Sequence, residues 1–111
     1  MTATLDDLVS GTATHLALAK GVELRTQKAG GQLGLALQIN REALQAKQLQ
    51  RVLERRFEQA LTYDGCFVFS TLDDALVLWH RLEGSDRVVN KVLSRLLSLA
   101  GLESLDRVGQ R

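Results

Sequence analysis

At 111 residues with 45% hydrophobic content, the chain has the size and composition of a single compact domain spanning residues 1–111. Its 14 Lys and Arg residues face 13 Asp and Glu residues, a formal charge of +1, so no strong global field favours nucleic acid or an anionic membrane. Cys66 is the only cysteine, and the sequence shows neither a signal-peptide pattern nor an apolar run of roughly 20 residues, so we expect a cytoplasmic protein without disulfides.

The first third of the chain predicts a helix followed by a hairpin. Apolar residues recur at helical spacing over residues 4–18. Residues 21–27 and 32–39 then alternate apolar and polar side chains on either side of Gly30 and Gly31. This pattern is typical of two strands joined by a tight turn.

The second half of the chain again predicts a helix followed by a hairpin, and then a closing helix. Apolar residues within 41–61 form one helical stripe, and this long helix is the clearest helical pattern in the chain. Residues 66–70 and 75–82 read as two apolar strands around a short acidic turn. A wide apolar stripe over residues 86–100 predicts a closing helix that stops at Gly101.

The expected fold is therefore α+β. Two hairpins would form an antiparallel sheet with three helices, in the order α-β-β-α-β-β-α. Residues 103–111 are charged and follow the last helix stop, so we expect a frayed tail there.

Side chains suited to catalysis are few. His15 and His80 are the only histidines, and one cysteine in a different element does not complete a zinc site with them. A triad of Cys66, His80 and Asp73 or Asp74 would need the two strands to align these groups. Direct pairing about the turn displaces His80 by one position from Cys66, so a buried thiol and a rim histidine are the better interpretation. We expect no enzymatic activity, no metal and no cofactor.

Charge is distributed in blocks along the second half. Residues 41–62 carry five basic and three acidic side chains, or +2; residues 63–84 carry one and four, or −3; residues 85–111 carry five and three, or +2. The basic residues of the first block include Lys47, Arg51, Arg55 and Arg56. Glutamates interleave with them, which favours a solvated helix face over a phosphate site. The blocks also support the hypothesis that an acidic protein partner docks against the basic helices.

The C-terminal half resembles the class I chaperones of type III secretion systems. The resemblance rests on a helix ending "LERRFEQAL", a glycine-opened strand "GCFVFS", an acidic turn, the strand "ALVLWHRLE" and an amphipathic closing helix. With the N-terminal helix and early strands in the family's order, it covers Leu5 to Leu102. The resemblance implies a small cytoplasmic protein that dimerises and holds a secreted client segment extended or masked, without covalent chemistry.

The resemblance also implies two surfaces. A client would lie over apolar residues of the first helix and early sheet, which gives the partner-binding candidates Leu5, Leu8, Leu16, Leu33, Leu35 and Leu37. Core packing is the alternative for each of them, because large apolar side chains are mostly buried. The long helix and the strand after it meet their symmetry mates in the family, which gives the dimer-interface candidates Leu49, Val52, Leu53, Phe57, Phe67 and Phe69. Together with Trp79, the phenylalanines mark the place to look for partners.

Three functions remain open at this point, and one of them, a small enzyme with an unrecognised site, would need a deep polar pocket that the sequence gives no reason to expect. The other two are binding functions. The first is a secretion chaperone, and the second is a chaperone-like regulator of the secretion system that binds and titrates another regulator. Effector chaperones of this class are typically acidic, and the sequence pI near 7.9 leaves room for the regulator or for one half of a heterodimer. In either case we expect a protein partner, in a homodimer or in a heterodimer with a homologue, and neither nucleic acid nor membrane.

Overall fold

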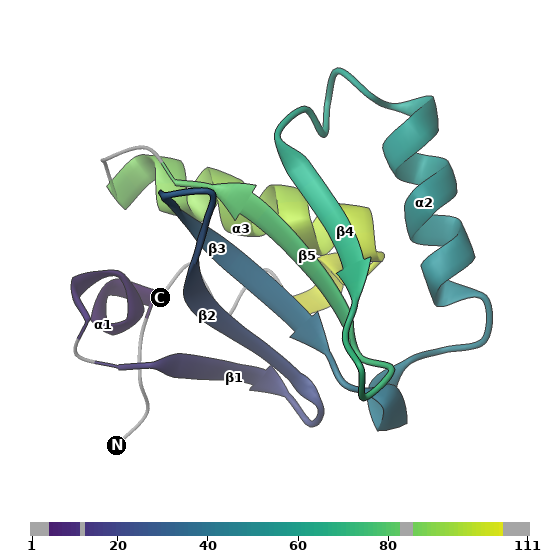
Figure 1. Cartoon of the computed structure of the whole chain (residues 1–111), viewed down its shortest axis with the longest axis horizontal. Coiled ribbons are helices and arrows are strands. Elements are labelled where there is room, and N and C mark those ends of the chain that lie inside the picture. The colour runs from purple at the N-terminus through teal and green to yellow at the C-terminus, as the bar shows by residue number, and fades with distance from the viewer. Residues whose placement is uncertain (1–4, 12, 83–85, 106–111) are drawn as a thin grey trace.

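A computed structural model describes residues 5–11, 13–82 and 86–105. The fold is built on one five-stranded antiparallel sheet, in which the strands lie in the order β1-β2-β3-β5-β4 (Figure 1). The helices are α1 (Leu5–Ser10), α2 (Gln48–Glu58) and α3 (Asp86–Ala100), with 3-10 turns η1 (Arg41–Ala43) and η2 (Glu103–Leu105). The strands are β1 (His15–Ala19), β2 (Val22–Ala29), β3 (Gln32–Ile39), β4 (Cys66–Ser70) and β5 (Leu76–Arg81).

The predicted order α-β-β-α-β-β-α is wrong, because residues 15–19 form a fifth strand. The fold is α+β, with α2 and α3 as its two long helices and a six-residue α1. Gly11 takes a φ of +86°, a left-handed conformation that ends α1. In β1, Leu16 and Leu18 are buried and alternate with exposed neighbours, and Leu16 pairs with Leu24 of β2. Leu16 therefore follows the strand period, although its spacing from the first leucines also fits a helix.

The hairpin of β2 and β3 is confirmed. Ala29 pairs with Gln32, so Gly30 and Gly31 alone form the turn, with φ of 59° and 81°. A two-residue turn with both central φ angles positive matches the right-handed twist of the strands, and glycine adopts it without a steric penalty.

The strands of the second hairpin are also confirmed, but their predicted register is wrong by one residue. Ser70 pairs with Leu76, because the loop holds five residues instead of four. Within it, the backbone N–H of Thr71 donates to the carbonyl of Ala75, and the Thr71 hydroxyl accepts from the N–H of Ala75. As a consequence, Cys66 lies directly opposite His80.

The core lies between α3 and one face of the sheet, and α3 crosses behind the strands in Figure 1. The predicted closing helix is confirmed and ends at Gly101, which has a φ of +78°. Fully buried side chains of the core include Leu24, Leu35, Leu37, Ile39, Leu76, Leu78, Leu93, Leu96 and Leu97. α1 contributes Leu8 to this core.

The helix predicted over residues 41–61 is shorter than expected. Residues 41–43 form η1, and α2 begins only at Gln48, after Lys47 takes a left-handed φ of 62°. The side-chain oxygen of Gln48 accepts from the backbone N–H of Gln45, 2.9 Å away, which helps to close the turn before the helix. α2 then stands beyond the β4 edge of the sheet (Figure 1).

Candidate protein-binding surfaces

The first candidate surface is an apolar row on α2. Leu49, Leu53 and Phe57 follow one another at intervals of four residues and are 40%, 48% and 84% exposed. Residues spaced by four lie on one face of a helix. We call these three side chains the α2 stripe. An exposed apolar row of this kind on a small protein is typical of a surface that another protein covers.

The inward side of α2 is mainly polar. Val52 is fully buried, but its neighbours on that side bind the carboxyl end of α3 through hydrogen bonds. The Gln48 side-chain amide donates to the carbonyl of Ala100 at 3.2 Å, and the Arg55 guanidinium donates to the carbonyls of Ser98 and Leu99. Carbonyls in the last turn of a helix lack the usual donor four residues on, and the negative end of the helix dipole favours a guanidinium there. The carbonyl of Ser98 also accepts from the backbone N–H of Gly101 at 3.2 Å. α2 thus contacts the protein mainly through polar groups and carries an apolar row among the polar side chains of its solvent side.

Arg56 ties the same helix to the edge of the sheet. Its Nε donates to the carbonyl of Cys66 at the start of β4, 3.0 Å away. Arg55 and Arg56 therefore do more than form a solvated face, whereas Arg51 is exposed. Together with the bonds to α3, this contact fixes how α2 presents its stripe.

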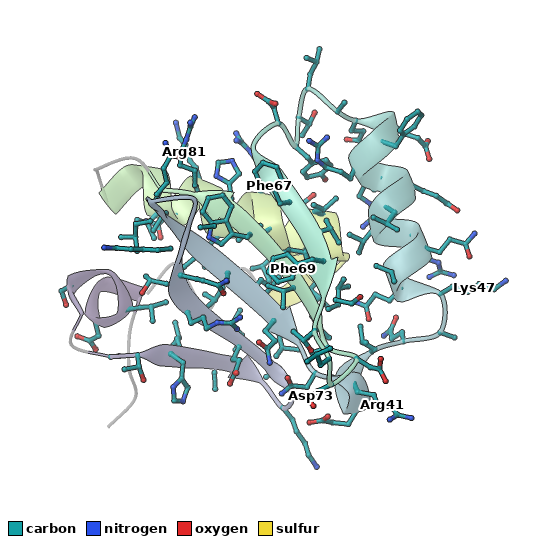
Figure 2. All side chains as sticks on the ribbon, viewed as in Figure 1. Arg41, Lys47, Phe67, Phe69, Asp73 and Arg81 are labelled. Atoms are coloured by element: carbon teal, nitrogen blue, oxygen red, sulfur yellow. The ribbon has the colours of Figure 1, made fainter. Side chains whose placement is uncertain are left out.

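The second candidate surface lies on the face of the sheet opposite α3. The Trp79 ring lies over Gly34, where a Cβ would fall 2.1 Å from Trp79 Cε2. Its Nε1 donates to the carbonyl of Gln27 at 2.9 Å, so the ring spans from β5 across β3 to β2. The Phe67 ring packs beside it, with centroids 5.8 Å apart and planes tilted by 45°. Phe67 and Phe69 project from β4 over the centre of this face in Figure 2.

These aromatic side chains line a groove of about 430 Å³. Its lining residues are Gln27, Ala29, Gln32, Phe67, Phe69 and Trp79, and we call it the aromatic groove. Phe67 and Phe69 remain 59% and 41% exposed, whereas Trp79 is buried. The groove is mainly apolar with amide side chains on one side, which suits an apolar side chain of a partner.

A comparison with protein-family models matched residues 2–105 to the family described as HrpV-like. The chain belongs to the HrpV-like family. This is a family of regulatory proteins associated with type III secretion, so the expected link to type III secretion and to regulation is confirmed. No curated protein and no solved structure matched the chain.

In this HrpV-like protein, the sequence-predicted partner residues lie mostly in the core. Leu8, Leu16, Leu35 and Leu37 are buried, and only Leu33, at 40% exposure, reaches solvent. The side chain of Leu5 is outside the described part of the structure. If an extended client binds to the first helix and to β1–β3, it therefore contacts almost none of these leucines.

The sequence-predicted interface residues lie largely on the surface. Leu49, Leu53, Phe57, Phe67 and Phe69 are exposed, while Val52 points inward. The structure groups them in two places, on α2 and in the aromatic groove. Sequence reasoning missed the groove residues of β2 and β3, Gln27, Ala29 and Gln32, because only the sheet register brings them beside β4 and β5.

Cys66 and His80 of the HrpV-like protein face each other in register but are each engaged elsewhere. Burial raises the pKa of the Cys66 thiol to about 11. The His80 ring lies between the carbonyl of Arg81, 2.7 Å from Nδ1, and the guanidinium of Arg95, 3.3 Å from Nε2. Because the carbonyl only accepts and the guanidinium only donates, Nδ1 carries the proton and Nε2 accepts. A protonated thiol and an occupied imidazole do not make a nucleophile and base.

Two further features concern the described residues only. Over residues 5–11, 13–82 and 86–105, no group of three or more His, Cys, Asp or Glu side chains is arranged to hold a metal ion. Within the same part of the chain, no helix has the length and hydrophobicity to cross a membrane.

Proposed function

We propose that this HrpV-like protein is a non-catalytic regulator of type III secretion that acts by binding another protein of the system, and that the α2 stripe is its main contact surface. The observation that carries the proposal is the exposed apolar row on α2, opposite inward contacts that are mainly polar. Gln48 and Arg55 face the protein, and Leu49, Leu53 and Phe57 face solvent. A helix that packed only on its own domain would show the opposite arrangement.

The α2 stripe has the dimensions of a helix-sized contact. Three side chains at intervals of four residues span about 12 Å at 1.5 Å per residue. Burying the parts of them that are still exposed contributes about 3–5 kcal/mol before the entropic costs of association. Such a row fits an apolar face of another protein, in the way that helices dock into apolar grooves.

A regulator fits the surface better than a client-holding chaperone. The chaperone interpretation depended on apolar patches of the first helix and early sheet, and four of its six leucines are in the core. A regulator that binds one other protein needs only one exposed apolar row, such as the α2 stripe, and a partner with a complementary apolar surface. We therefore propose that the protein binds and titrates another regulator, either as a homodimer or in a heterodimer with a homologue.

The absence of catalysis is part of the same proposal. The buried Cys66 thiol has its pKa raised to about 11, and His80 is held between a carbonyl and a guanidinium. Neither group is free to act as nucleophile or base. In this proposal, the regulatory effect comes from protein binding alone.

The test compares two leucines. Leu53 lies in the α2 stripe, and Leu72 is fully exposed in the β4–β5 loop, outside both candidate surfaces. Tagged full-length protein carrying Leu53→Ser or Leu72→Ser is expressed in the native host, its partner is identified by mass spectrometry, and transcripts of secretion genes are measured. We expect Leu53→Ser to lose both the partner and the regulatory effect, and Leu72→Ser to keep both. Equal unfolding midpoints in urea exclude a folding defect. A Leu53→Ser protein that keeps its partner and its effect on transcripts contradicts the proposal.

A further inference from the structure

The face of the sheet opposite α3, called the open face below, combines the aromatic groove with Arg25, which forms no ion pair with any carboxylate of the described residues. Arg25, Ala36, Trp79 and Phe67 are successive register partners across β2, β3, β5 and β4. Register partners in neighbouring strands point to the same face of a sheet. Arg25 and the two aromatic rings therefore belong to one surface.

Neutral amides hold the Arg25 guanidinium in place. One terminal nitrogen donates to the side-chain oxygen of Gln38, and the other donates to that of Gln27 at 2.9 Å. Gln38 in turn donates to the side chain of Asn40 at 2.7 Å. Gln27 also lines the aromatic groove, so the guanidinium lies next to the groove.

No carboxylate among the described residues forms an ion pair with Arg25. The ion pair of the described chain joins Arg41 and Asp74, on the loops at the end of the sheet. Glu23 shares the face with Arg25 but does not lie within ion-pair distance of it. Of the five N–H groups of a guanidinium, two are used by the amides. The remaining donors are suited to an incoming carboxylate.

Two arginines lie on the same face of the sheet as the aromatic groove. Its lining contains no charged side chain. Arg25 lies beside it, and Arg81, paired with Gly34 under the Trp79 ring, adds a second basic residue to the same face. An apolar groove beside two arginines favours a ligand that is both apolar and acidic.

From this charge and shape, we propose that the open face of the sheet binds an acidic protein segment that places an apolar side chain in the aromatic groove and a carboxylate on Arg25. The inference rests on the proposed protein-binding function and specifies the chemistry of a second contact, distinct from the α2 stripe. β2 and β4 are separated by three strand spacings of about 4.8 Å, so the apolar and acidic side chains lie within about 14 Å. An extended segment covers that distance with about four residues.

Trp79 reports directly on this site, because it is the only tryptophan of the chain. The probes are three tryptophan-free synthetic peptides of about ten residues, about 33 Å when extended. The first alternates glutamate with leucine and phenylalanine. The second has lysine in place of glutamate, and the third has alanine in place of leucine and phenylalanine. Each is titrated into the full-length protein while the emission of Trp79 is recorded.

We expect the first peptide to shift the emission of Trp79 saturably and the other two to bind at least about tenfold more weakly, since each lacks one half of the recognition. Arg25→Gln should weaken the first peptide by about tenfold, and Arg25→Lys should restore part of the loss. Phe69→Ser, at an exposed position, should also weaken binding without unfolding the protein. Raising the salt from about 50 to about 500 mM should weaken the wild-type complex more than the Arg25→Gln complex, because screening acts on the ion pair.

Leu53→Ser separates this inference from the proposed function. Because Leu53 lies in the α2 stripe, the Leu53→Ser protein should bind the first peptide as the wild type does. If it loses the host partner yet binds the peptide, both proposals stand. If it retains the partner and binds the peptide, only the proposed function fails. An unchanged Trp79 emission with the acidic peptide, or equal affinity for the lysine peptide, overturns the inference made here about the open face.

Discussion

At the scale of single residues, Trp79 and Gly34 depend on each other. The indole lies where any side chain at position 34 would be, and its Nε1–H is satisfied by the carbonyl of Gln27. A buried indole N–H without a partner is costly, so the ring is held in one place. This arrangement forms the floor of the aromatic groove.

Gly34→Ala should therefore destabilise the protein. The added Cβ falls 2.1 Å from Trp79 Cε2, so the ring must move and lose its hydrogen bond. We expect a loss of about 1–3 kcal/mol in the free energy of unfolding, measured in urea, with a red shift of the tryptophan emission. In the double variant Gly34→Ala/Trp79→Phe, the loss should be smaller than the sum of the single losses. Additive losses would show that the two positions are independent.

Cys66 provides a pH-dependent contribution to stability. Its thiol has a pKa of about 11 in the folded protein, raised from 9.0 by burial. Between about pH 9 and pH 11 the unfolded chain loses this proton while the folded protein keeps it, so stability falls as the pH rises. Below pH 9 the contribution is fully present. The free energy of unfolding, measured in urea, should fall over that pH range in the wild type by about 2–3 kcal/mol more than in Cys66→Ala. Parallel pH profiles of the two proteins would contradict the assignment.

At the scale of elements, α2 is fixed by polar bonds to the end of another helix. Arg55 and Gln48 satisfy carbonyls at the last turn of α3, and Arg56 binds the edge of β4. The connection uses few apolar contacts besides Val52. The orientation of the α2 stripe thus depends on a small set of hydrogen bonds.

Removing Arg55 tests this dependence. Arg55→Met retains much of the aliphatic stem but loses the bonds to the carbonyls of Ser98 and Leu99. We expect a loss of about 1–3 kcal/mol in the free energy of unfolding and faster amide hydrogen exchange in α2 and in the last turn of α3. Arg51→Met, at an exposed position of the same helix, is the matched control and should leave both unchanged. If the two variants behave alike, Arg55 does not hold the helices together.

At the scale of the whole molecule, the two apolar surfaces differ in their surroundings. The α2 stripe lies on a helix beyond the β4 edge, and the aromatic groove lies on the open face of the sheet (Figures 1 and 2). The described chain is small, with a radius of gyration of 13.0 Å. Exposed apolar area on a domain of this size is expected to drive association.

We predict that the purified protein self-associates when its partner is absent. Sedimentation velocity at micromolar concentration should show a dimer, and Phe57→Glu should convert it to a monomer, because the interface would bury an unpaired charge. Leu72→Glu, in the β4–β5 loop, should remain dimeric. A wild-type protein that sediments only with the mass of a monomer contradicts a homodimer and leaves the heterodimer as the expected assembly.

Much of the local structure followed from the sequence alone. Gly30 and Gly31 between alternating runs predicted a tight hairpin turn, and the apolar stripe before Gly101 predicted α3 with its end. These signals are local, since turn chemistry and side-chain period act over a few residues. The scarcity of histidine and cysteine argued against a catalytic site by counting.

Tertiary contacts decided the rest. Leu16 fits both a helix and a strand, and pairing with Leu24 in the sheet selects the strand. The five-residue loop shifts the register, so that Cys66 rather than its neighbour faces His80. The position of Trp79 over Gly34 depends on the order β3-β5-β4, which residues far apart in sequence establish. Which apolar side chains remain exposed depends on what covers them: α3 covers one face of the sheet, and no element of the described chain covers the α2 stripe.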